Sequence, residues 1–320
     1  MQQFRNILVG VDLTQIDEIS AEHIPAPSRE AVKQAIWLGG QVGAELTFIS
    51  TLNVAGHDSS EATAAAETMP AALQTAVSRV HERLVEQAGE QGVAARGKLV
   101  AGKNWVEMIR QVVRTGHDLV IAGTRHRNHV GQFLFGSTGM KLLRYCPCPV
   151  WLTKPGFRDD ENEVLDILIA TDLSPVGQQA LELGISGGQL LDARFHILHS
   201  IEHHTKLRMR FSDVPDEKVE ARKAEKLEQA TQRLHEQLIQ TDHRTLTWGT
   251  QQHVVDGPAH KVILQAIEQH EADLLIMGTV ARGGIPGGLI GNTAERLLPR
   301  ISCSLLAVKP EDFTCQIAPD

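Results

Sequence analysis

The chain contains one domain-sized sequence twice, and this duplication constrains its fold more than any other feature. Segments 102–155 and 257–310 align without a gap at a register of 155 residues, the separation of Gly123 from Gly278. At the same register Gly136 aligns with Gly291 and Cys148 aligns with Cys303. A repeat of this length indicates two copies of one folding unit. The total of 320 residues is also the length expected of about two domains.

The composition is that of a globular protein, with 42% hydrophobic and 22% charged residues. A net charge of −8 gives no broad attraction to nucleic acid, so we expect no nucleic-acid partner. No apolar run reaches the length of a membrane span, and the first residues lack the pattern of a signal peptide. The four cysteines form neither a CxxC motif nor a zinc-type pair of pairs, which favours the reducing cytoplasm.

Both halves open with an apolar strand that ends on an acid, Asp12 in the first half and Asp172 in the second. Near-continuous apolar runs of this kind indicate strands buried on both faces, as in a parallel sheet. The first half has further runs at 46–50, 119–122 and 150–152, and a weaker strand near Leu99. The second half has the corresponding runs at 195–198, 274–277 and 305–308, and a weaker strand near Val254.

Helical patterns separate these strands. Leu73, Val77, Val80 and Leu84 recur at helical spacing in the first half, and a helix that starts at Pro215-Asp216-Glu217 is expected in the second. Alternation of strands and helices predicts an α/β fold in which each half is a doubly wound, five-stranded parallel-sheet domain. The expected domains are 1–156 and 163–310, joined by a short polar linker and followed by a tail at 311–320 that has no counterpart.

The halves differ in length between their first two strands. Asp12 and Asp172 lie 160 residues apart, whereas Ala44 and Ala193 lie only 149 apart, so the first half has 11 extra residues. We place this insertion in the segment 14–27, after the carboxyl end of a central strand. Open α/β sheets bind ligands at that end.

The strongest candidate site is the loop after the fourth strand. A glycine at the strand end leaves room for the backbone, and a helix that begins at Gly-Ser-Thr offers free N–H groups and hydroxyls to an anion. The first copy has Gly123, Arg125, His126, Gly136, Ser137 and Thr138. The second copy has Gly278, Arg282, Gly291, Asn292 and Thr293. The alternative is that these glycines and hydroxyls only cap a helix.

These loops resemble the nucleotide-binding motif of the universal stress protein family, G-2x-G-9x-G-(S/T). The resemblance covers essentially the whole chain, and Gly291-Asn292-Thr293-Ala294-Glu295 resembles the tandem two-domain E-type members. It implies a Rossmann-like fold that binds ATP, with Mg²⁺ as a possible companion of the nucleotide. The phosphates would lie on the loop, the ribose near Asp12 or Asp172, and the adenine near Ser50-Thr51 or His199-Ser200.

The resemblance also implies pairing through the last strands. The expected partners are 150–152 and 305–308, so the two halves would form an internal pseudo-dimer. A homodimer of two chains is a further possibility.

Both copies depart from the family motif. The middle glycine is His126 in the first copy and Ala281 in the second, and Asn292 replaces the Ser/Thr after the last glycine. We therefore expect two clefts of one architecture that bind ligand unequally.

The resulting hypothesis is a cytoplasmic stress-response protein that binds ATP or a related nucleotide in one or both halves. It would act as a regulatory module and not as an enzyme, since no residues for fast catalysis can be assigned. The alternatives are a scaffold or carrier of an apolar ligand, and a slow ATPase. No metal site is expected, because His199, His203 and His204 lack a matching set of ligands and are interpreted as exposed loop histidines.

Overall fold

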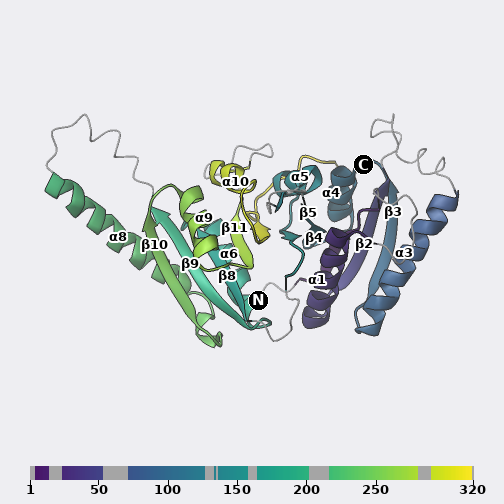
Figure 1. Cartoon of the computed structure of the whole chain (residues 1–320), viewed down its shortest axis with the longest axis horizontal. Coiled ribbons are helices and arrows are strands. Elements are labelled where there is room, and N and C mark those ends of the chain that lie inside the picture. Colours follow the sequence, from purple (N-terminus) through teal and green to yellow (C-terminus); the bar gives the residue numbers. More distant parts are fainter. Residues whose placement is uncertain are drawn as a thin grey trace. The chain divides into compact units, whose positions relative to one another are not determined.

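The computed structural model describes residues 4–13, 24–52, 71–126, 133–134, 136–157, 164–201, 216–279 and 290–318 (Figure 1). These residues form two compact units. The N-terminal unit contains the described residues up to 157 together with 304–318. The C-terminal unit contains the described residues between 164 and 279 together with 290–303.

The sheet of the N-terminal unit has the strand order β3–β2–β1–β4–β7–β12. The first five strands are mutually parallel, and β12 runs antiparallel to β7. The strands are β1 (Asn6–Gly10), β2 (Glu45–Leu52), β3 (Ala95–Ala101), β4 (Leu119–Gly123), β7 (Val150–Thr153) and β12 (Ser304–Val308). The strand β12 belongs to the second sequence repeat, yet it completes the sheet of the N-terminal unit.

The sheet of the C-terminal unit has the order β10–β9–β8–β11, and its strands are parallel. They are β8 (Leu165–Thr171), β9 (Ala193–Ile201), β10 (Thr250–Asp256) and β11 (Leu274–Gly278). Strand pairing in this unit repeats that of the N-terminal unit. Leu8 pairs with Thr47 in the N-terminal unit, and the residues 160 and 149 positions later, Leu168 and His196, pair in the C-terminal unit. The duplication is therefore structural as well as sequential.

Helices alternate with the strands along the chain (Figure 1). The N-terminal unit has α1 (Ala26–Val42), α3 (Ala71–Glu90), α4 (Asn104–Thr115) and α5 (Ser137–Tyr145). The C-terminal unit has α6 (Pro175–Gly188), α8 (Asp216–Leu238), the short 3-10 helix at His243–Thr245, α9 (Ala259–Gln269) and α10 (Asn292–Leu297). The predicted α/β fold with a parallel sheet in each half is confirmed.

Local sequence explains where several helices begin and end. A proline lies in the first turn of both helices, as the second residue of α1 and the first of α6. A missing N–H costs little there because the N–H groups of the first turn have no intrahelical acceptor. The helices α1 and α4 end at Gly43 and Gly116, whose φ angles of 68° and 64° are left-handed and suit glycine. The helix predicted near Pro215 begins at Asp216.

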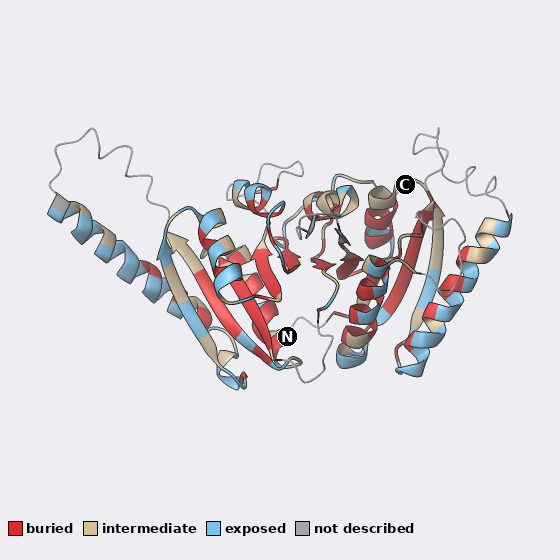
Figure 2. Cartoon of the chain, viewed as in Figure 1, coloured by how far each residue is buried: buried red, intermediate tan, exposed pale blue. Residues whose placement is uncertain are grey.

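The core of each unit lies along its central strands, which are red in Figure 2. In β1 the side chains of Ile7, Leu8 and Val9 are fully buried, as expected for a strand covered on both faces. Burial of each such side chain stabilises the fold by about 1.5–3 kcal/mol. The outer helix α8 is mostly exposed and buries Leu234 and Leu238 near its end. Within the described residues, no helix is both long and apolar enough to cross a membrane.

Candidate functional site

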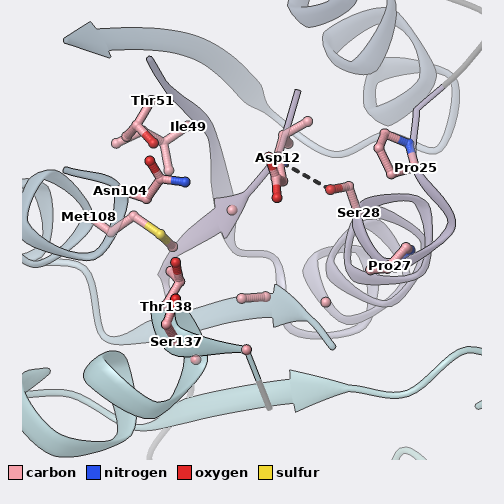
Figure 3. Close-up of a pocket in the computed structure, with 16 residues that line it drawn as sticks. Asp12, Pro25, Pro27, Ser28, Ile49, Thr51, Asn104, Met108, Ser137 and Thr138 are labelled. Atoms are coloured by element: carbon pink, nitrogen blue, oxygen red, sulfur yellow. Dashed lines mark hydrogen bonds between the residues drawn. The ribbon is translucent and has the colours of Figure 1, made fainter. Parts of the chain in front are cut away.

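A cleft of about 140 Å³ opens in the N-terminal unit at the carboxyl ends of β1, β2 and β4. Its walls come from the residues that follow these strands and from the first turns of α1, α4 and α5 (Figure 3). Of the predicted site residues, Asp12, Gly123, Gly136, Ser137 and Thr138 all line this one cleft. The structure thus brings together residues that span 126 positions of the sequence, from Asp12 to Thr138.

The first turn of α5 forms one wall of the cleft. Gly136 occupies the position before the helix, and its carbonyl accepts a hydrogen bond of 3.0 Å from the Met140 N–H. The N–H groups of the first helical residues have no acceptor within the helix, and the N-cap residue Gly136 has no side chain to accept from them. Because the helix dipole adds partial positive charge here, this wall suits an anionic group.

The start of α1 forms the opposite wall, with Pro25, Pro27 and Ser28 (Figure 3). The Asp12 N–H donates to Ser28 Oγ over 2.9 Å, which ties the loop after β1 to this helix. A Cβ at Gly123 would lie only 1.9 Å from the carbonyl oxygen of Pro27. Gly123 is therefore required because the backbone of α1 crosses directly over the end of β4.

A buried chain of hydrogen bonds supports the floor of the cleft. The hydroxyl of Ser50 donates to the Val11 carbonyl over 3.0 Å, and its oxygen lies 2.9 Å from His81 Nε2. Since the Ser50 proton is used, the second bond requires His81 Nε2–H as the donor. Burial lowers the pKa of His81 to about 4, so the imidazole is neutral in this arrangement.

Several lining residues were not among the predicted site residues. Ser28 and Asn104 line the cleft from the first turns of α1 and α4, and Met108 lines it from the second turn of α4. Neither helix start matches a known motif. In the sequence, only the position of each helix after the end of a strand could have indicated these residues. Thr51, which lines the cleft beside Ile49, lies where the sequence placed the adenine.

Arg125 and His126 form the two-residue strand β5, which pairs antiparallel with β6 (Phe133–Leu134). The backbone after β4 therefore enters a short hairpin where the family motif has its middle glycine. The sequence predicts that the side chains of Arg125 and His126 add positive charge beside the cleft, and this stays a prediction.

The corresponding residues of the C-terminal unit have a different local arrangement. The carboxylate of Asp172 accepts hydrogen bonds from the backbone N–H of Ser174, over 3.0 Å, and from its hydroxyl. Ser174 is the N-cap of α6, at the position that Pro25 occupies before α1. Asp172 thus takes part in a helix cap.

The glycine loop of this unit is partly described. A Cβ at Gly278 would lie 2.7 Å from Val176 Cγ1, a side-chain atom and not backbone. The Gly291 N–H donates to the Thr279 carbonyl over 2.8 Å, and Asn292 and Thr293 open the short helix α10. Ala281 and Arg282 lie outside the described residues.

Comparison with known proteins gives a consistent result. The sequence profile described as "Universal stress protein family" matches residues 3–154 and 164–309. Universal stress protein E of Escherichia coli K12 is 23% identical over all of this chain and 98% of its own length. Universal stress protein E of Photorhabdus laumondii is 26% identical over 71% of this chain and 73% of its own.

Among solved structures, a putative universal stress protein from Pseudomonas aeruginosa superimposes with a TM-score of 0.65 at 22% identity. The match covers 97% of this chain and 95% of that one. At this identity the likeness shows a common fold.

Proposed function

The chain belongs to the universal stress protein family, as its sequence motifs predicted, and on that premise we propose that its N-terminal unit binds ATP or a related nucleotide. The nucleotide would regulate the conformation or partner surface of a cytoplasmic stress-response module, without fast catalysis. The single observation that supports this proposal best is the convergence of Asp12, Gly136, Ser137 and Thr138 on one cleft.

Each wall of the cleft suits one part of a nucleotide. The phosphates would lie at the first turn of α5, where N–H groups and the hydroxyls of Ser137 and Thr138 can donate. The ribose hydroxyls would donate to Asp12, and the base would lie beside Ile49 and Thr51. Pockets for drug-sized ligands usually measure about 300–1,000 Å³, so the described walls, which surround about 140 Å³, would enclose only part of a nucleotide.

The residues that line the described cleft favour binding over chemistry. Asp12 is the single ionisable side chain among them, whereas phosphoryl transfer needs a cationic clamp and an oriented water. The carboxylate of Asp12 and the hydroxyls of Ser137 and Thr138 are oxygen donors of the kind that Mg²⁺ prefers, so an accompanying Mg²⁺ would fit this set. When bound, Mg²⁺ would neutralise charge on the phosphates.

We place the principal site in the N-terminal unit and not in the C-terminal one. In the latter, Asp172 is engaged in the cap of α6, and Asn292 replaces the hydroxyl-bearing Ser137. Ribose binding there would have to compete with the Ser174 hydrogen bonds.

Calorimetric titration with ATP, ADP and AMP tests the proposal. We expect the wild-type chain to bind ATP and the Thr138→Val variant to bind it roughly 10-fold or more weakly, because a hydrogen bond to a charged group contributes about 1.5–3 kcal/mol. The matched variant Thr293→Val, at the aligned position of the other copy, should bind ATP as the wild type does.

Two results would contradict the proposal. One is the lack of any binding at millimolar nucleotide by a chain that unfolds cooperatively. The other is native mass spectrometry of freshly purified protein that finds a retained lipid in place of a nucleotide, which would favour the apolar-carrier alternative. Equal weakening by both threonine variants would show instead that the two clefts bind alike.

A further inference from the structure

Three imidazoles meet within the C-terminal unit, far along the chain from one another. His196 lies in β9, His253 lies in the neighbouring strand β10, and His270 ends α9, which packs on β8 and β9 (Figure 1). One ring nitrogen of each histidine lies within 4.8 Å of the other two. We propose that this histidine cluster, His196–His253–His270, binds a divalent transition-metal ion of the zinc class.

The spacing of the first two ligands fits one metal ion. His196 Nδ1 and His253 Nε2 lie 3.4 Å apart. Two nitrogens that bind one tetrahedral Zn²⁺ at about 2.0–2.1 Å are separated by roughly 3.3–3.4 Å. The two strands therefore already present a pair of nitrogens at the distance of a tetrahedral edge.

A carboxylate orients the most buried histidine. His196 Nε2 lies 3.0 Å from Asp166 Oδ1, and the other oxygen of Asp166 pairs with Arg194. With its Nε2 proton donated to Asp166, His196 keeps the Nδ1 lone pair directed toward His253. A carboxylate behind a ligating imidazole is the usual outer partner in protein zinc sites, where it fixes the tautomer and raises the basicity of the ligand.

The third ligand must turn to complete the site. The rings of His196 and His270 are stacked, with centroids 3.9 Å apart and planes inclined by 24°. An imidazole binds metal through a lone pair in its ring plane, so a stacked ring does not yet point at the ion. His270 is half-buried at the end of a helix, and we expect its side chain to rotate when the metal binds.

A histidine binds metal through its neutral imidazole. Burial, followed by the neighbouring rings, lowers the pKa values of His253 and His270 from 6.5. Asp166 supplies negative charge that would partly offset the charge of the ion. Three imidazoles leave a fourth tetrahedral position for water or another ligand.

The duplicated fold provides an internal control for this cluster. Strand pairing makes His196 equivalent to Thr47 and His253 equivalent to Lys98, while His270 aligns with Thr115. In the N-terminal unit these positions make ordinary polar contacts: Thr47 accepts from Arg96 Nε over 3.0 Å, and Lys98 Nζ donates to Gln111 Oε1 over 2.5 Å. The fold therefore does not require histidine at any of the three positions.

The test uses the full-length chain after removal of metal with a chelator. Zn²⁺ titration by calorimetry should show one tight site, and Co²⁺ should give the visible absorption of a tetrahedral nitrogen site. His253→Gln and His270→Thr each remove a ligand and should weaken Zn²⁺ binding by more than the roughly 10–100-fold that loss of an outer partner causes. His235→Gln, which changes an exposed histidine elsewhere in this unit, is the matched control and should bind as the wild type does.

Asp166→Asn separates orientation from coordination. This variant should bind Zn²⁺ roughly 10–100-fold more weakly than the wild type, with the same stoichiometry and the same Co²⁺ spectrum. Thermal unfolding of each variant without metal checks that it folds, and Zn²⁺ should raise the Tm of the wild type but not of the ligand variants. The proposal is overturned if His253→Gln and His270→Thr bind Zn²⁺ as tightly as the wild type, or if the folded wild type does not bind it at micromolar concentration.

Discussion

At the residue scale, His81 shows how a buried polar side chain can support the cleft of the N-terminal unit without lining it. It lies in α3, against Gly97, where a Cβ would come within 2.4 Å of His81 Cβ. Through Ser50 it holds the Val11 carbonyl, one residue before Asp12. These hydrogen bonds fix the backbone next to Asp12, so the geometry of the cleft depends on residues that do not line it.

The same burial predicts a dependence of stability on pH. The pKa of His81 is lowered to about 4 by burial, and that of His117 is lowered to about 4 by the same main cause. A histidine whose folded pKa lies below its unfolded value of 6.5 favours the folded state above about pH 6.5. That stability is lost as the pH falls toward 4.

We expect the wild-type free energy of unfolding to fall by about 1–2 kcal/mol per buried histidine between pH 7 and pH 5. Urea unfolding at both pH values measures the change. The His81→Gln variant keeps an N–H donor but does not titrate, so its free energy of unfolding should fall less than that of the wild type between the two pH values. An equal loss in wild type and variant would show that His81 does not contribute.

At the element scale, the strands are the part that the sequence predicted best. Every expected strand is present. Most are longer than the apolar runs, as where β9 extends from Ala193 to Ile201 instead of 195–198, whereas β1 ends at Gly10 and not at Asp12. The residues added at the carboxyl end pair with β10, and Ala193 and Arg194 pair with β8, contacts that a pattern of apolar residues cannot reveal. The hairpin of β5 and β6 escaped prediction for the same reason, because two-residue strands have no periodicity.

The packing of α1 on β4 predicts unequal effects of one substitution in the two copies. In Gly123→Ala the new methyl would meet the Pro27 carbonyl, a backbone atom that can move only with α1. We expect a loss of stability of about 1–3 kcal/mol, together with weaker ATP binding. Gly278→Ala meets the Val176 side chain at 2.7 Å and not a backbone atom at 1.9 Å, so it should lose less stability.

Thermal or urea unfolding of both variants measures the difference. If the two alanine variants lose the same stability, the close approach of α1 is not what requires glycine at position 123.

At the scale of the whole molecule, β12 is the strand that the sequence assigns to the second repeat and that the structure places in the sheet of the N-terminal unit. Leu305 pairs with Leu152, and Ala307 pairs with Val150, so β12 covers the edge of β7 in the N-terminal unit. The buried Lys309 that follows donates to the Leu143 carbonyl over 2.5 Å, and burial lowers its pKa to about 8. The N-terminal unit is thus completed by the last strand of the chain.

A chain that ends at residue 303 should therefore lose the N-terminal unit as a stable fold. It would expose the buried strand β7 as a sheet edge, a common route to aggregation. The lost burial of the β12 side chains is worth on the order of 5 kcal/mol or more, comparable with the total stability of a typical domain. A chain that ends at residue 310 keeps β12 and serves as the control.

Thermal unfolding and size-exclusion chromatography compare the two truncations. A chain ending at 303 that remains monomeric, with an unfolding transition like that of the control, would contradict the importance of β12.

The sequence by itself determined the duplication, the parallel α/β fold and the place of the candidate cleft. These follow from local periodicity and from glycine and hydroxyl residues close together in the chain, such as Gly136-Ser137-Thr138. Only the tertiary structure decided that Gly123 accommodates α1, that Asp172 is engaged in a helix cap, and that three separate histidines converge. Those features depend on the register of neighbouring strands and on how closely helices approach them, and both are set by contacts between residues far apart in the sequence.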